Sequence, residues 1–147
     1  MDLHLKDKKI VVTGAASGLG ADVFSSLLDE GAYPIGVDLL SFSGSELEGR
    51  LTGTFFTSGR NYQFYNGSAS DELWMREIFS NLSNDLYGLV SCVGILGGDN
   101  AHGGRSLASF DKLIDAHART AFVATEMAYP KMVNGGSIVY IGSIEID

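Results

Sequence analysis

The hydrophobic pattern of this chain alternates between two spacings. Short runs of nearly continuous apolar residues indicate buried strands, and longer segments with apolar residues three or four positions apart indicate amphipathic helices. The strand pattern is found in five segments, at residues 9–13, 33–37, 62–65, 88–93 and 137–141. The helical pattern is found in four segments between them, at residues 19–30, 45–51, 71–82 and 107–129.

Strands that alternate with helices predict a parallel sheet covered on both faces. Right-handed crossovers then give the strand order 3-2-1-4-5, a doubly wound α/β fold of the Rossmann type within a single domain of residues 1–147. The strand order reverses between the first and fourth strands, so a ligand crevice is expected at their carboxyl ends. Ser70 is the expected N-cap of the helix at residues 71–82.

The segment between the first strand and the first helix has the sequence Thr-Gly-Ala-Ala-Ser-Gly-Leu-Gly, residues 13–20. Glycines allow a sharp turn and a close backbone approach to an anion, and a helix N-terminus adds free N–H groups and partial positive charge. This order of strand, glycine turn and helix predicts a diphosphate site, whereas an isolated glycine motif also fits a flexible turn without a ligand. The expected binding residues of this loop are Gly14, Ala16, Ser17, Gly18, Leu19 and Gly20.

Asp38 follows the second strand, at the spacing of about 20 residues beyond the glycine loop that suits a ribose-binding carboxylate. A negative charge there would repel a 2′-phosphate, so Asp38 predicts NAD(H) in preference to NADP(H). The alternative role is that of an ordinary aspartate capping the next turn.

The pattern T-G-x-x-x-G-x-G and its context resemble the short-chain dehydrogenase/reductase family, and the resemblance extends along essentially the whole chain. It implies a dinucleotide cofactor and hydride transfer to or from an alcohol or carbonyl substrate. Ser91, Cys92, Val93 and Gly94 stand where the family has N-N-A-G and would line the adenosine ribose.

Further residues take their expected roles from the same resemblance. Asn66 stands where the family often has an aspartate that binds the adenine amino group, and Gly67 would loosen the neighbouring wall. Ser143 corresponds to the catalytic serine, although a strand-end serine also caps turns. His117 replaces a family asparagine that serves a proton relay, and a core histidine with satisfied hydrogen bonds is the other interpretation. His102, in the glycine-rich loop 97–104, is expected to be a solvated loop residue.

The Tyr-x-x-x-Lys pair expected from the family is absent, because none of the six tyrosines has a lysine four positions later. The chain is thus expected to be truncated after the fifth strand, to bind NAD(H) weakly and to turn over no substrate alone. The alternative function is a non-catalytic dinucleotide-binding or interaction protein. It would dimerise through the open edge of strand 137–141 or through helix 107–129.

Composition restricts the remaining classes of function. The net charge of −8 and a pI of about 4.7 oppose nucleic-acid binding, which needs a basic surface. The single cysteine, Cys92, excludes an intrachain disulfide and a multi-cysteine metal site, and we expect it to be a small buried apolar residue. No apolar run is long enough to span a membrane and no signal-peptide pattern is present, which predicts a cytoplasmic protein.

Overall fold

The computed structural model describes residues 3–53, 61–95 and 106–142 and contains a five-stranded parallel sheet. The strands are β1 (Lys9–Thr13), β2 (Tyr33–Asp38), β3 (Gln63–Asn66), β4 (Leu86–Ser91) and β5 (Ser137–Tyr140). Their order is β3-β2-β1-β4-β5, which confirms the predicted doubly wound topology. The helices α1 (Gly18–Asp29), α2 (Glu46–Gly53), α3 (Glu72–Ser80), α4 (Leu107–Leu113) and α5 (Thr120–Ala128) connect them.

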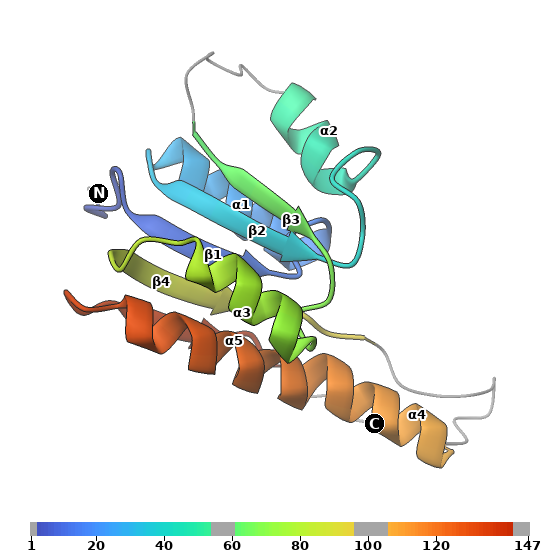
Figure 1. Ribbon diagram of the computed structural model, residues 1–147. Helices are drawn as coiled ribbons and strands as arrows, with labels where there is room; N and C mark the ends of the chain where they lie inside the picture. Colours follow the sequence, from blue (N-terminus) through green and yellow to red (C-terminus); the bar gives the residue numbers. More distant parts are fainter. Residues whose placement is uncertain (1–2, 54–60, 96–105, 143–147) are drawn as a thin grey trace.

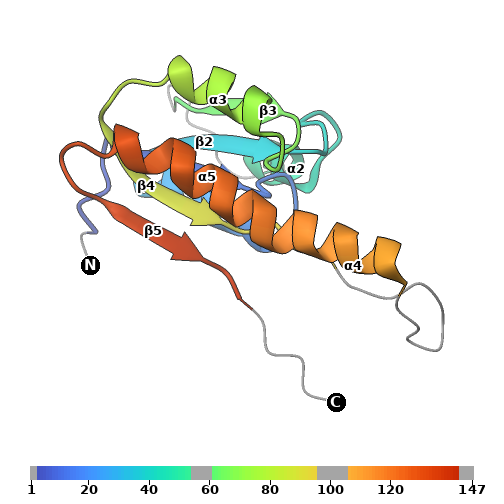
Figure 2. The same ribbon diagram turned by 60° about the horizontal axis from the view of Figure 1, so that its bottom comes forward.

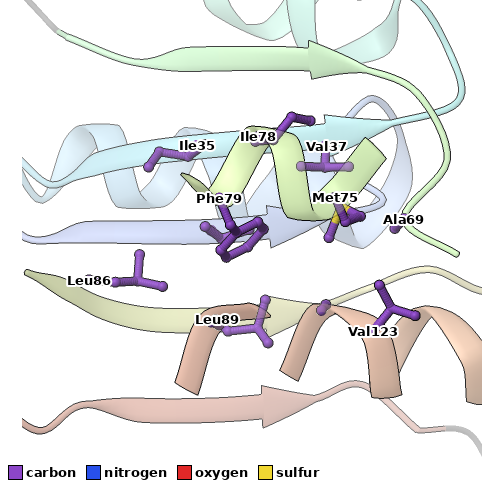
Figure 3. Close-up of a cluster of buried hydrophobic side chains, with 12 residues drawn as sticks. Ile35, Val37, Ala69, Met75, Ile78, Phe79, Leu86, Leu89 and Val123 are labelled. Atoms are coloured by element: carbon purple, nitrogen blue, oxygen red, sulfur yellow. The ribbon is translucent and has the colours of Figure 1, made fainter. Parts of the chain in front are cut away.

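The helices cover the sheet from both sides, with α3 and α5 on one face and α1 on the other (Figure 1). Figure 3 shows the first of the two resulting cores, in which Met75 and Phe79 of α3 face Ile35 of β2 and Leu89 of β4. The second core contains the fully buried Phe24 of α1. Burial on both faces explains why the central strands are continuously apolar.

The start of α2 packs into the second core through Leu47, which is fully buried. Its N-terminus has the sequence Ser-x-x-Glu of a capping box. The Ser45 hydroxyl accepts a hydrogen bond from the Glu48 N–H at 3.0 Å, and Glu48 Oε2 accepts one from the Gly44 N–H at 2.7 Å.

Two expected boundaries were wrong. The N-cap of α3 is Asp71, whose carboxylate accepts a hydrogen bond from the Trp74 N–H at 3.1 Å, and the Ser70 hydroxyl instead binds the distant Asp115. Strand β4 spans Leu86–Ser91 rather than residues 88–93, and its register against β1 shifts between Lys9 and Ile10. A serine and an aspartate that follow each other are equally good caps, so the local pattern left the choice open.

The segment predicted as one helix at residues 107–129 is helical throughout but not α-helical throughout. A π-helical stretch, Ile114–Arg119, separates α4 from α5, and a short 3-10 turn, Tyr129–Lys131, follows α5. Helix α4 extends beyond the end of the sheet (Figure 2). The apolar positions here are consequently not core: 54% of Phe110 in α4 and 43% of Ile114 at the start of the π-helical stretch are exposed.

Candidate dinucleotide-binding site

A cleft of about 970 Å³ lies at the carboxyl ends of β1, β2 and β4, where the strand order reverses. Its walls come from the glycine loop, the segments that follow these strands, and the helical stretch from α4 to α5. Nine of the expected site residues line it: Gly14, Ser17, Gly18, Leu19, Gly20, Asp38, Cys92, Val93 and Gly94. The fold therefore brings together residues that are far apart in the sequence at the predicted edge of the sheet.

The glycine loop is shaped by positions that admit no side chain. Gly14 has φ +73°, and a Cβ there would lie 2.9 Å from the Val93 backbone nitrogen. A Cβ on Gly20 would overlap the carbonyl group of Gly14. These contacts hold the start of α1 directly against the turn, so its backbone can approach a bound group closely.

The first turn of α1 presents free amides to the cleft. Its first intrahelical bond runs from the Ala21 N–H to the Ser17 carbonyl at 3.2 Å, and within the described residues the N–H groups of Leu19 and Gly20 have no hydrogen-bond partner. The turn contains no acidic residue, and the N-cap Ser17 makes no side-chain capping bond. Two unpaired amides at a helix N-terminus form an environment that favours an anion.

The Asp38 carboxylate is held in place by two backbone amides. Its Oδ2 accepts a hydrogen bond from the Ala16 N–H and its Oδ1 accepts one from the Leu40 N–H, both at 2.8 Å. Ala16 does not line the cleft itself, and its contribution is to orient Asp38. Each carboxylate oxygen retains a further lone pair that can accept a hydroxyl.

Asn66 and Gly67 lie behind the cleft rather than in its wall. The Asn66 side-chain amide donates to the carbonyl oxygens of Asp38 at 3.1 Å and Leu39 at 2.9 Å, and thereby supports the end of β2. The expectation that Gly67 loosens this region was wrong, because the ring of Trp74 occupies the space that a side chain at Gly67 would need.

The turn after β4 forms another wall. Ser91 is buried behind it, and its hydroxyl oxygen accepts a hydrogen bond from the Thr13 hydroxyl at 3.4 Å. Cys92 donates its backbone N–H to the Thr13 carbonyl at 3.0 Å, which fixes the turn against β1. The Cys92 side chain is half-buried, and this burial raises the pKa of its thiol.

The interpretation of His117 as a core residue was wrong, because its side chain is exposed. His117 lies in the π-helical stretch, where its Nε2 is 3.2 Å from the Ile95 nitrogen and 3.0 Å from the Ile95 oxygen. It therefore binds the backbone that leaves β4. The apolar helical pattern could not reveal this, because a π-helical turn rotates the following side chains and α4 extends past the sheet.

One wall of the cleft is polar, and the sequence pattern did not predict it. The Ser70 hydroxyl donates to Asp115 Oδ2 at 2.7 Å, and Arg119 Nε lies 2.7 Å from Asp115 Oδ1. The hydroxyl of Ser68 is 2.9 Å from that of Ser70, and all four residues line the cleft. The i, i+4 spacing of Asp115 and Arg119 indicates their ion pair from the sequence. Their contact with Ser70 could not be predicted, because the loop after β3 is far from them in the chain.

Some expected site residues lie outside the described residues, namely Ser143 and the loop 97–104 with His102. In the ranges that the structure describes, there is no group of three or more histidine, cysteine, aspartate or glutamate side chains arranged to hold a metal ion. No helix in those ranges has both the length and the apolar character needed to cross a membrane.

Comparison with known proteins relates almost the whole chain to one family. Residues 8–146 match the short chain dehydrogenase family. The chain is 30% identical to a 3-beta-hydroxysteroid dehydrogenase of Comamonas testosteroni, over 98% of its own length and 55% of the relative's. It is 27% identical to a sorbitol-6-phosphate 2-dehydrogenase of Klebsiella pneumoniae, over 96% of its own length and 54% of the relative's. The chain thus spans about half the length of these curated relatives.

Solved structures have the same arrangement of strands and helices. A variant of a short-chain dehydrogenase/reductase from Serratia marcescens superposes with a TM-score of 0.77 at 25% identity, and covers 95% of this chain and 56% of its own. The ligand-free aldohexose dehydrogenase of Thermoplasma acidophilum gives a TM-score of 0.75 at 21% identity, over 95% of this chain and 51% of its own. At 21% identity, the similarity to the aldohexose dehydrogenase shows a shared fold and nothing further.

Proposed function

Because this chain belongs to the short chain dehydrogenase family, we propose that its cleft binds NAD(H) in support of hydride transfer between the nicotinamide and an alcohol or carbonyl substrate. When bound, the cofactor supplies the hydride chemistry. The residues of this chain bind and orient it. The observation that carries the proposal is the meeting of Asp38 and the glycine loop in one cleft, with the Ala16 N–H donating to the carboxylate at 2.8 Å.

The glycine loop fits a diphosphate. The N–H groups of Leu19 and Gly20, which have no partner among the described residues, lie at the N-terminus of α1, and both residues line the cleft. Gly14 and Gly20 let the turn and the start of α1 pack directly against neighbouring backbone, because a Cβ at either position would overlap backbone atoms. Because the fold already fixes these amide donors, they can bind an anion without losing further conformational entropy.

Asp38 supports the preference for NAD(H) over NADP(H). Two backbone amides hold its carboxylate, so the charge cannot swing away when a 2′-phosphate approaches. The 2′-hydroxyl of NAD(H) can instead donate a hydrogen bond to the same carboxylate. Val93 and Gly94 line the cleft on the β4 side and would contact the adenosine ribose.

The substrate class rests on relatedness. The two curated relatives are named for a hydroxysteroid and for a sugar phosphate, so what they share is oxidation of an alcohol rather than a substrate skeleton. Ser143 is the residue that we propose to contact the substrate oxygen. The printed sequence holds no Tyr-x-x-x-Lys pair, so the 147-residue chain by itself should bind cofactor without measurable turnover.

The test is a titration of the folded chain with NADH and NADPH, in which binding is measured by calorimetry and by NADH fluorescence. We expect NADH to bind at least about tenfold more tightly than NADPH, and Asp38→Ser to remove most of the difference. Asp7→Asn is a matched control, because Asp7 is exposed and precedes β1 at the opposite end of the sheet. Absence of NADH binding by folded protein overturns the proposal.

One observation favours the second candidate, a binding protein that acts as a dimer. In the described part of the chain, β5 pairs only with β4, and 45% of Val139 and 54% of Tyr140 are exposed. Phe122 of α5 is 66% exposed. Sedimentation equilibrium distinguishes the candidates: a monomer at micromolar concentration argues against dimerisation through either surface, whereas a dimer supports it.

A further inference from the structure

The N-terminus of α1 is capped from another helix. Gly18, its first residue, donates its N–H to Glu46 Oε2 of α2 at 2.9 Å. This partner is unusual because the N-cap Ser17 makes no side-chain bond and the first turn of α1 has no acidic residue. A carboxylate at this position offsets part of the positive electrostatic potential at the helix N-terminus, which would otherwise attract a bound anion.

Glu46 is not needed to start its own helix. The Ser45 hydroxyl caps α2 by accepting from the Glu48 N–H, and the Glu48 carboxylate accepts from the Gly44 N–H, one residue before this cap. The two glutamates of the first turn of α2 therefore differ in reach: Glu48 accepts from the Gly44 N–H just before its own helix, whereas Glu46 also accepts from the Gly18 N–H of the glycine loop. This division makes Glu48 a matched control for Glu46, with the same charge on the same helical turn.

The Glu46 carboxylate is held close to the loop by its surroundings. The Leu47 N–H donates to the Ala16 carbonyl at 3.0 Å, and the Leu47 side chain is fully buried, which fixes the start of α2. Arg50 Nη2 lies 2.5 Å from Glu46 Oε1, and Arg50 Nη1 lies 2.5 Å from Asp22 of α1. The three side chains bridge α1 and α2 and carry a net charge of −1 at neutral pH.

We propose that Glu46 is an affinity-determining residue of the dinucleotide site, a built-in anion on the Gly18 amide that weakens the binding of phosphate-bearing ligands. The inference rests on the proposed function, because it assumes that the glycine loop receives the diphosphate. Gly18 lines the cleft beside Leu19 and Gly20, whose amides have no partner in the described part of the chain. The Glu46 charge therefore lies one residue from the expected anion position. The Gly18 hydrogen bond and then Arg50 lower the pKa of Glu46, so it is ionised at neutral pH.

Two consequences separate this role from a structural one. First, the Glu46 charge should weaken the binding of negatively charged ligands and leave the binding of neutral ligands unchanged. Second, because Glu46 is exposed, dissolved salt should screen its effect. A residue that merely supports the shape of the loop would change the binding of neutral and charged ligands alike, with no dependence on salt.

The experiment compares wild type, Glu46→Gln and the control Glu48→Gln by calorimetric titration with NADH, ADP and adenosine. Glutamine keeps an oxygen that can accept from the Gly18 N–H. We expect Glu46→Gln to bind NADH and ADP about fivefold more tightly at low salt, and less than about twofold more tightly in concentrated salt. Its adenosine affinity should equal that of wild type, and Glu48→Gln should resemble wild type with all three ligands.

Glu46→Ala provides a second variant in case Glu46→Gln does not fold. It removes the charge and releases the Gly18 N–H, so it should also tighten NADH binding. The inference is overturned if wild type binds NADH but the Glu46 variants bind it no more tightly than Glu48→Gln does, or if adenosine binding changes equally. If wild type binds no NADH at all, the proposed function itself fails.

Discussion

The Asp38 carboxylate accepts a hydrogen bond from the Ala16 N–H at 2.8 Å, which joins the end of β2 to the glycine loop that follows β1. Its other oxygen accepts from the Leu40 N–H at the same distance. A single side chain thus connects the glycine loop to the end of β2 and also caps the turn that follows β2. The residue expected to select the nucleotide also stabilises the site in which it acts.

Replacing Asp38 with asparagine should therefore cost stability as well as selectivity. An asparagine side chain has one acceptor oxygen, so either the Ala16 or the Leu40 N–H loses its partner. We expect the free energy of unfolding to fall by about 1–2 kcal/mol, measured by urea denaturation without cofactor. Asp7→Asn, at the other end of the sheet, should change it by less than about 0.5 kcal/mol. Equal stabilities of the two variants would contradict this role of Asp38.

Two helical glycines offer a matched test of the close contact in the glycine loop. A Cβ at Gly20 of α1 would overlap the Gly14 carbonyl, whereas one at Gly49 of α2 would meet no atom within 4 Å. Gly20→Ala should lower the free energy of unfolding by about 1–3 kcal/mol and abolish NADH binding. Gly49→Ala should raise stability by about 0.5–1 kcal/mol and leave binding unchanged. Thermal unfolding and calorimetry measure both; a stable, NADH-binding Gly20→Ala variant would refute the tight packing.

Acid should weaken the contact at the start of β4. Hydrogen bonds from Ser83 and Lys9 lower the pKa of Asp85 below its ordinary value of 3.8. A lowered folded-state pKa stabilises the protein above the unfolded value, and this contribution is lost as the pH falls through the folded value. The stability difference between wild type and Asp85→Asn should thus be present near pH 7 and decrease progressively below about pH 4.

Urea denaturation of wild type and Asp85→Asn across this range measures the effect. Asp111→Asn, which changes an exposed carboxylate on α4, serves as the control for the loss of a surface charge. Because Asp85 is exposed, the difference should be small and should decrease with added salt. A difference that grows on acidification would have the wrong sign for this mechanism.

Cys92 provides a probe of the cleft, because it is the single cysteine of the chain and lines the cleft wall. Burial raises the pKa of its thiol, which reduces the thiolate fraction at neutral pH. The folded protein should therefore react with a disulfide reagent much more slowly than the urea-unfolded protein, and saturating NADH should slow it further. If NADH binds but leaves the rate unchanged, the dinucleotide does not cover the turn after β4.

Much of the fold was predictable because it depends on local patterns. Apolar runs at β1 and β2 and the intervening glycine turn identified the parallel sheet, and the handedness of crossovers then supplied the strand order. The position of the cleft followed from that order. The boundaries of α3 and β4 were less accurate, because Ser70 and Asp71 are both suitable caps and a register shift leaves no mark in hydrophobicity.

The remaining features of the site depend on contacts between distant segments. Nothing near Glu46 in the sequence indicates that its partner is Gly18, and nothing near Ser70 indicates Asp115. The exposed position of His117 also depends on a π-helical stretch and on how far α4 extends beyond the sheet. Such features could not be inferred from spacing within one element.

The resemblance of the glycine motif identified the family. The sheet order and the position of the glycine loop followed from the amino-acid pattern, because backbone sterics and hydrophobic periodicity act over a few residues. The hydrogen-bond partners around the cleft depend on packing: Asp38 accepts from the Ala16 N–H, Glu46 accepts from the Gly18 N–H, and the Asn66 side chain donates to the Asp38 carbonyl. Hydrogen bonds form over about 3 Å, so their partners are known only once packing has brought distant segments together.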